Sequence, residues 1–123
     1  MISITLRTAP VDCWSCGCET EIVSSLSLEN GEHNLECSVA DFTDYAHLLS
    51  ILQEEASQRA SVGLLKLRYS ATMKQEYANN GCSHCDALFG QHYEIHTRYD
   101  EKDAISMTRR ADDATAPFAR ATI

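Results

Sequence analysis

Cysteines are the residues of this 123-residue chain whose chemistry and spacing are most informative. Four of the six form two C-x-x-C pairs, Cys13 with Cys16 and Cys82 with Cys85. Two intervening residues allow both sulfurs of a pair to reach one metal ion, and zinc binds four thiolates in a tetrahedron. The two pairs therefore predict one closed, structural zinc site, and the fold must bring the pairs together.

Three other uses of the same sulfurs stay open. A redox pair needs its first cysteine at the start of a helix, where the dipole lowers the thiol pKa, whereas "CGCETEIVSSL" predicts a strand. A disulfide framework needs an exported protein, and "MISITLRTAP" lacks the basic and apolar segments of a secretory signal. Iron suits the same tetrahedral sulfur shell as zinc. We favour structural zinc and expect a cytoplasmic protein.

The residues that follow the two pairs fit such turns. Gly17 stands where the backbone often becomes left-handed, which glycine allows without strain. Asp86 stands at the matching position of the second pair and tolerates that conformation better than most residues. Paired turns with strands leading in and out resemble the knuckles of zinc-ribbon and rubredoxin-like sites. This resemblance implies a fold and a metal, and it implies no reaction.

A looser resemblance covers "CWSCG" together with "YANNGCSHCDALFGQHYEIH". These segments resemble small bacterial zinc proteins of unassigned function, in which C-x-H-C-G precedes an aromatic-rich strand. Here Asp86 replaces the glycine, and an extra glycine precedes Cys82. Both departures leave the zinc interpretation intact.

The two remaining cysteines are expected to be structural. Cys18 lies two residues after Cys16 and could substitute as a ligand, but a side chain beside the site is the simpler interpretation. Cys37 falls on the expected inward face of a hairpin, where a free cysteine behaves as a small apolar residue.

The segment "HYEIH" is the best candidate for catalysis. If it is a strand, His92, Glu94 and His96 project from one face and could bind a second metal or transfer protons. The solvated side of a half-buried strand carries the same residue types without any function. His84, inside the second cysteine pair, could replace a cysteine as ligand.

Aromatic residues near the cysteines offer a site of another kind. Trp14 stands between two expected ligands, where its ring either shields the sulfurs or is exposed as a binding anchor. An exposed patch around Trp14 and Phe89 would indicate a protein-interaction surface.

Charge and hydropathy restrict the partners. The formal net charge is −8, and residues 1–97 carry all of the excess, with 5 basic and 13 acidic side chains. Such a body repels phosphate backbones, so nucleic acid is an unfavourable partner. No apolar run approaches the roughly 20 residues of a membrane span. Protein is the partner that we expect.

The expected elements alternate between strands and one helix. Ile2, Ile4 and Leu6 alternate with polar residues in a strand that Pro10 ends. A hairpin turns at Asn30-Gly31 and so pairs Leu26 with Leu35, Ser24 with Cys37 and Ile22 with Val39. A helix capped by Asp41 or Thr43 runs to about Ala56. Further strands are expected in "LLKLRYS" and "QHYEIHTRY", and a short helix from Asp100 to about Arg110.

These elements predict an α+β fold, with a small antiparallel sheet that carries two zinc knuckles and one main helix packed on it. Residues 1–99 form a single zinc-bound domain in this hypothesis, and residues 100–123 a C-terminal extension. The function that we expect is a non-catalytic structural-zinc protein that acts as a protein-interaction or accessory module. The alternative is an enzyme that uses the face of His92, Glu94 and His96.

Overall fold

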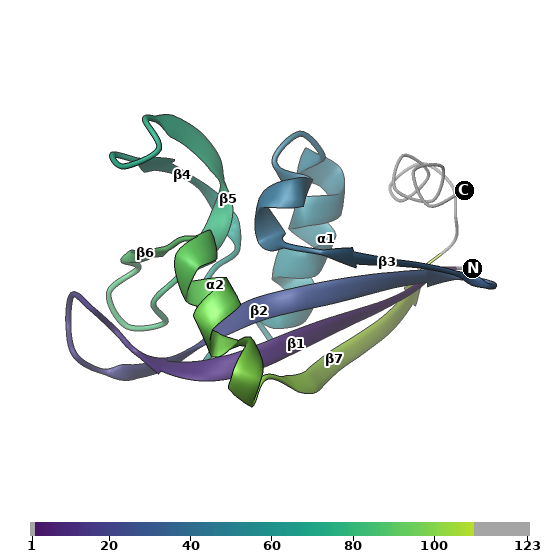
Figure 1. Cartoon of the computed structure of the whole chain (residues 1–123), viewed down its shortest axis with the longest axis horizontal. Helices are drawn as coiled ribbons and strands as arrows, with labels where there is room; N and C mark the ends of the chain where they lie inside the picture. The colour runs from purple at the N-terminus through teal and green to yellow at the C-terminus, as the bar shows by residue number, and fades with distance from the viewer. Residues whose placement is uncertain (1, 110–123) are drawn as a thin grey trace.

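Antiparallel strands build two sheets in the computed structural model, which describes residues 2–109 (Figure 1). The main sheet has the strand order β3-β2-β1-β7, and the smaller sheet has the order β4-β5-β6. One main helix, α1, packs on the main sheet, so the arrangement is α+β with more strand than helix. The strands are β1 (Ile2–Asp12), β2 (Glu19–Asn30), β3 (His33–Cys37), β4 (Lys66–Ser70), β5 (Gln75–Gly81), β6 (Leu88–Phe89) and β7 (Lys102–Arg109).

The structure confirms the alternating pattern expected of the opening strand, β1. Ile2, Ile4 and Leu6 are buried in the main core against α1. The strand passes through Pro10 and ends at Asp12, so the expectation that Pro10 ends it is wrong. β7 pairs with β1 only as far as Thr8, which leaves the later part of β1 at an edge of the sheet. Proline lacks the N–H of a ladder and is tolerated at such an edge.

The hairpin of β2 and β3 is confirmed, but its turn lies one residue later than expected. Asn30 pairs with His33, so Gly31 and Glu32 form the turn. Gly31 has a φ of +66°, which suits the first central position of a type II′ turn. The predicted pairs Leu26–Leu35, Ser24–Cys37 and Ile22–Val39 are therefore wrong. Each partner shifts by two residues, and the apolar face stays the same because side chains alternate with period two.

The helix α1 (Ala46–Ala56) has the expected buried stripe of Leu48, Leu49, Leu52 and Ala56. Its predicted cap is wrong, because the helix starts after Tyr45 and no side chain caps it. Asp41 lies instead in the preceding 3-10 turn η1 (Val39–Phe42), and Thr43 follows directly as its C-cap residue. There the Asp41 carboxylate accepts the Ser38 N–H at 2.9 Å.

The last third of the chain differs most from the expectation. The expected strand "QHYEIHTRY" is the helix α2 (Gln91–Thr97) followed by the 3-10 turn η2 (Arg98–Asp100). The expected helix from Asp100 is wrong, because residues 102–109 form β7, which pairs antiparallel with β1. This segment completes the main sheet. The rest of the expected C-terminal extension, residues 110–123, lies outside the described residues.

The small sheet stands beside the main one and exposes part of its surface. The strand expected in "LLKLRYS" is confirmed as β4, but Leu67 and Tyr69 are 41% and 65% exposed. Asn80 of β5 joins the two sheets, because its side-chain amide pairs with the N–H and C=O of Val23 in β2 at 2.8 and 2.9 Å. Within residues 2–109, no helix has the length and apolar character needed to span a bilayer.

Candidate metal centre

Two hairpin loops of equal length carry the four paired cysteines. Residues 13–18 connect the paired Asp12 and Glu19, and residues 82–87 connect the paired Gly81 and Leu88. In each loop the N–H of the first cysteine donates to the carbonyl five residues later. The carbonyl of the same cysteine accepts a hydrogen bond from the N–H four residues later. The four bonds are Cys13 N to Cys18 O (2.9 Å), Gly17 N to Cys13 O (2.9 Å), Cys82 N to Ala87 O (3.0 Å) and Asp86 N to Cys82 O (3.0 Å). We call these loops the two cysteine turns.

Both cysteine turns place a left-handed residue directly after the second cysteine, as the sequence predicts. Gly17 has a φ of +77° and Asp86 a φ of +64°. The same bend in both turns directs the two sulfurs of each pair to one side.

Asp86 is also clamped by β4, which explains an aspartate at a position where glycine suits the backbone. Its carboxylate accepts a hydrogen bond from the Arg68 guanidinium and lies 2.9 Å from the Lys66 ammonium. Desolvation opposes ionisation here, but these two cations lower the pKa of Asp86. The Arg68 side chain is only 9% exposed and also donates to the carbonyl of Asn79 at 2.9 Å. The second cysteine turn is therefore fixed from outside the C-x-x-C motif.

The four sulfurs converge, which confirms the expectation that the fold brings the two cysteine pairs together. All four Sγ atoms lie within 4.8 Å of one another. Across the two turns, Cys13 Sγ lies 3.6 Å from Cys85 Sγ, and Cys16 Sγ lies 3.7 Å from Cys82 Sγ. Zinc bound tetrahedrally at about 2.3 Å from each sulfur separates the sulfurs by about 3.8 Å. The cluster therefore has the size that such a metal requires.

The electrostatics of the cluster also favour a cation. Desolvation opposes the Cys13 thiolate, yet the backbone N–H groups of Cys16 and Ser15, at 3.4 and 3.3 Å from its sulfur, lower the pKa of Cys13 to about 6. A backbone hydrogen bond from Cys18 favours the Cys16 thiolate, but desolvation and the neighbouring thiols raise the pKa of Cys16 to about 12. The surroundings therefore favour the Cys13 thiolate and oppose the Cys16 thiolate, and a bound divalent ion would favour both.

Side chains hold the two cysteine turns against each other in a nearly reciprocal way. The Trp14 indole N–H of the first turn donates to the Leu88 carbonyl after the second turn, at 2.9 Å. The His84 ring of the second turn contacts the Glu19 carbonyl after the first turn, at 3.2 Å. His84 therefore directs its ring at the backbone, and it is not among the clustered ligand atoms. These two contacts link the cysteine turns on either side of the sulfur cluster.

The remaining cysteines lie outside the cluster. Cys18 is exposed and is the last residue of the first cysteine turn. Cys37 is buried in the main core, as its place on the inward face predicted. Burial, followed by the nearby carboxylates of Asp41 and Glu36, raises the pKa of Cys37 to about 12.

Phe89 corrects the prediction of an exposed aromatic patch. Its ring is fully buried behind the cysteines, in a small cluster with Cys13, Cys82 and Ile22. The Tyr93 ring packs edge-on against it, with ring centroids 4.9 Å apart. Trp14, by contrast, is 58% exposed.

The polar cluster expected in "HYEIH" does not exist as one face. Residues two apart on a helix point in opposite directions. His92 and His96, one turn apart on α2, are exposed with ring centroids 4.2 Å apart. Glu94 points inward and is 1% exposed, and neither carboxylate oxygen has a hydrogen-bond partner among the described residues. The three groups cannot act on one substrate.

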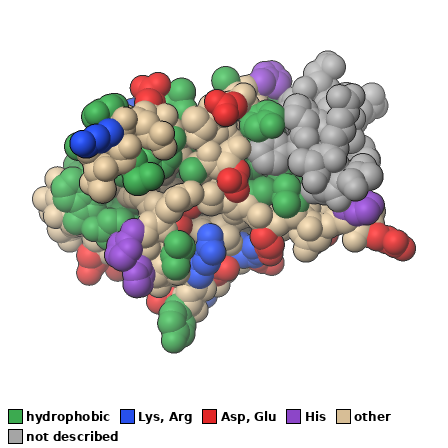
Figure 2. All heavy atoms as spheres, turned by 45° about the horizontal axis from the view of Figure 1, so that its top comes forward, with side chains coloured by type: hydrophobic (Ala, Val, Ile, Leu, Met, Phe, Trp, Pro, Cys, Tyr) green, Lys and Arg blue, Asp and Glu red, His purple; other side chains and the backbone are tan. Residues whose placement is uncertain are grey.

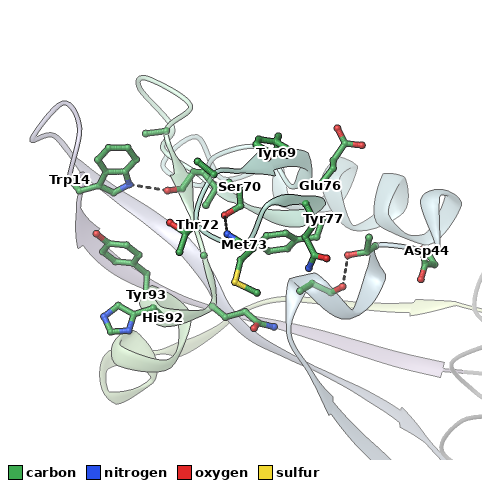
Figure 3. Close-up of a pocket in the computed structure, with 18 residues that line it drawn as sticks. Trp14, Asp44, Tyr69, Ser70, Thr72, Met73, Glu76, Tyr77, His92 and Tyr93 are labelled. Atoms are coloured by element: carbon green, nitrogen blue, oxygen red, sulfur yellow. Dashed lines mark hydrogen bonds between the residues drawn. The ribbon is translucent and has the colours of Figure 1, made fainter.

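A groove with a volume of about 1020 Å³ lies beside the exposed Trp14 ring (Figure 3). Its walls are the start of α2, the end of β4, the β4–β5 turn, β5, β6 and residues 40–44. We call it the aromatic groove, because its large side chains are Trp14, Tyr69, Met73, Tyr77, Leu88 and Tyr93. The sequence offered no signal for it beyond Trp14, since the other walls come from separate elements.

No protein-family model, curated protein or solved structure matches this chain. The likeness to zinc-ribbon sites therefore rests on the geometry of the two cysteine turns and their sulfurs. Within residues 2–109 this is the one cluster of three or more potential metal-ligating side chains.

Proposed function

We propose that this chain is a protein-interaction module whose fold is stabilised by one zinc ion bound to Cys13, Cys16, Cys82 and Cys85. Each cysteine turn then forms one zinc knuckle of a zinc-ribbon-like site. The distances of 3.6 and 3.7 Å between sulfurs of opposite turns carry the metal part of this proposal. Four thiolates leave zinc no open position for a substrate, so the ion has a structural role.

The position of the site in the fold supports that role. The first cysteine turn belongs to the main sheet and the second to the smaller sheet. A bound ion closes the long loop between residues 16 and 82 and ties the two sheets together at one end. Because an unfolded chain has no preformed site, much of the free energy of metal binding becomes free energy of folding.

The interaction part of the proposal is carried by the exposure of Trp14 at the edge of the aromatic groove. Its indole N–H is already bonded to Leu88, so the ring is held in place while more than half of it meets solvent. Hydrophobic side chains also gather over the β4–β5 hairpin, at the left-hand end in Figure 2, and the exposed ones include Leu67, Tyr69 and Met73. Contiguous exposed apolar surface of this kind commonly marks a protein-binding site.

Affinity capture with matched variants tests this proposal. Trp14→Ala removes the fixed ring at the groove, and Ile95→Ala removes a similarly exposed apolar side chain on α2, outside the groove. Both variants should retain one zinc ion per chain and a cooperative unfolding transition, and Trp14→Ala should melt at a somewhat lower temperature because it loses the hydrogen bond to Leu88. Proteins captured by the unmodified chain should be retained by Ile95→Ala and lost by Trp14→Ala, because aromatic anchors often carry about 2 kcal/mol or more of an interface. Equal capture by all three chains would contradict the interaction role.

A further inference from the structure

We propose that the aromatic groove binds an extended, proline-containing peptide segment that carries arginine or lysine at one end. This inference rests on the proposed function as a protein-interaction module and names the chemistry of the partner. Three features of the groove carry it, namely its rings, its free hydroxyl groups and its charge.

The rings of the groove suit proline side chains. Trp14 and Tyr93 lie at one end, with His92, and the Tyr77 ring lies across the groove from them (Figure 3). Met73, at the β4–β5 turn, is exposed between these ends. Grooves lined by aromatic rings bind polyproline II segments, whose conformation is already formed before binding and costs little entropy to fix.

The tyrosine hydroxyl groups supply donors that such a segment needs. A polyproline II backbone makes no internal hydrogen bonds, so its carbonyl groups remain free to accept. Within residues 2–109, the hydroxyl groups of Tyr69, Tyr77 and Tyr93 form no hydrogen bond. The groove therefore offers several uncommitted O–H donors, set on rings that also provide apolar contact.

The charge of the groove selects a basic end on the peptide. Among the lining residues the formally charged ones are Asp44 and Glu76, which lie at the end away from Trp14 (Figure 3). Both side chains are exposed, and in the described part of the chain neither forms a salt bridge. Two unpaired carboxylates beside an apolar groove are complementary to arginine or lysine, which also stack on aromatic faces.

Addition of a peptide strand to the small sheet is a less suitable mode at this position. Of the strands that line the groove, β5 is paired on both sides, β4 contributes only its last two residues, and β6 has only two residues. Its Leu88 carbonyl already accepts the Trp14 indole N–H at 2.9 Å. A peptide in the groove would therefore be recognised by side chains and not by a backbone ladder.

Fluorescence polarisation on the zinc-bound protein tests this inference. The probe is a labelled octaproline peptide that ends in two arginines. Control probes replace the arginines with glutamates, or the prolines with alternating glycine and serine, and chitohexaose tests for a glycan ligand. The arginine probe should bind saturably, and each of the three controls should bind about tenfold more weakly or not at all.

A charge swap makes the test specific for the groove. The double variant Asp44→Lys, Glu76→Lys should lose about tenfold in affinity for the arginine probe, since each exposed ion pair contributes up to about fivefold, and should gain affinity for the glutamate probe. The matched control, Glu29→Lys with Glu32→Lys, makes the same change in net charge at the β2–β3 turn, at the far end of the molecule (Figure 1). It should bind the arginine probe as the unmodified protein does at physiological salt.

The outcomes separate this inference from the function on which it rests. A folded, zinc-bound protein that binds none of the peptides, that binds chitohexaose instead, or that binds the arginine probe equally well after the charge swap would overturn the peptide assignment. A dimer in light scattering that dissociates on Met73→Ala would assign the groove to a second copy and overturn it as well. Loss of zinc or of the fold would be detected separately, by metal content and melting temperature, and would count against the structural-zinc proposal.

Discussion

Replacing Glu94 with glutamine tests whether water is excluded from the buried side of α2, where the Glu94 side chain is 1% exposed. Burial raises the pKa of Glu94 to about 7, because desolvation disfavours the charged carboxylate. The Val39 N–H, the Arg98 guanidinium and the Asn80 amide favour the charged form more weakly, and Asp41 opposes it. None of these groups reaches hydrogen-bonding geometry with either Glu94 oxygen.

The shift predicts a loss of stability as the pH rises. Between the ordinary value of 4.5 and about 7, the folded chain holds a proton on Glu94 that the unfolded chain has released. The free energy of unfolding therefore falls through this window and levels off above pH 7. The full cost of ionising the buried group corresponds to about 3 kcal/mol. Glutamine stays neutral and avoids this cost.

Urea unfolding of both chains at matched zinc saturation, from pH 5 to pH 8, measures the effect. Because both chains have the same sulfurs, the pH dependence of metal binding cancels in the difference between them. The stability of Glu94→Gln relative to the unmodified protein should rise by about 2–3 kcal/mol over this range. A difference that does not change with pH, or an NMR titration of Glu94 near 4.5, would show that water or an unseen partner solvates the carboxylate.

Three further predictions follow from the turns and the cysteines. Gly31→Val should lower the free energy of unfolding by about 1–3 kcal/mol, because a β-branched residue resists the positive φ. Gly31→Asn should cost much less, and equal melting temperatures of the two variants would contradict the observed turn. Arg68→Met should cost about 2–4 kcal/mol and weaken zinc binding by releasing Asp86 and the second cysteine turn, and an unchanged zinc affinity would contradict the clamp. Iodoacetamide should alkylate the exposed Cys18 in the folded protein but not Cys37, because burial raises the pKa of the Cys37 thiol to about 12. Mass spectrometry after proteolysis distinguishes the two cysteines, and rapid loss of the Cys37 thiol would contradict its burial.

The convergence of the four cysteines could be predicted from the sequence, because two short motifs with the same spacing supply the four ligands that one metal ion needs. Each C-x-x-C pair with a left-handed residue after it specifies its own turn, and Gly17 and Asp86 both have the expected conformation. The helix α1 was equally accessible, since its apolar stripe persists over several turns. The β2–β3 register could not be predicted, because two registers that differ by two residues bury the same face.

The errors after Gly90 have a different cause. In "QHYEIHT" the apolar residues alternate, but seven residues are too few to separate a strand from a short helix, and packing decides. Because the segment is a helix and not a strand, Glu94 is buried instead of exposed. β7 did carry a signal in the alternation of Ile105 and Met107, which face the core. The aromatic groove and the Arg68 clamp depend on contacts between distant elements, which no local pattern encodes.

Metal analysis of the protein purified under reducing conditions tests the central claim most directly. Elemental analysis should find one zinc ion per chain, and cobalt exchanged into the site should give the visible absorption of tetrahedral thiolate coordination. Cys13→Ser and Cys85→Ser should each lose the ion and the cooperative unfolding transition together. A metal-free, reduced protein that unfolds with the same transition before and after chelation would contradict the account, as would Cys13, Cys16, Cys82 and Cys85 recovered as disulfides.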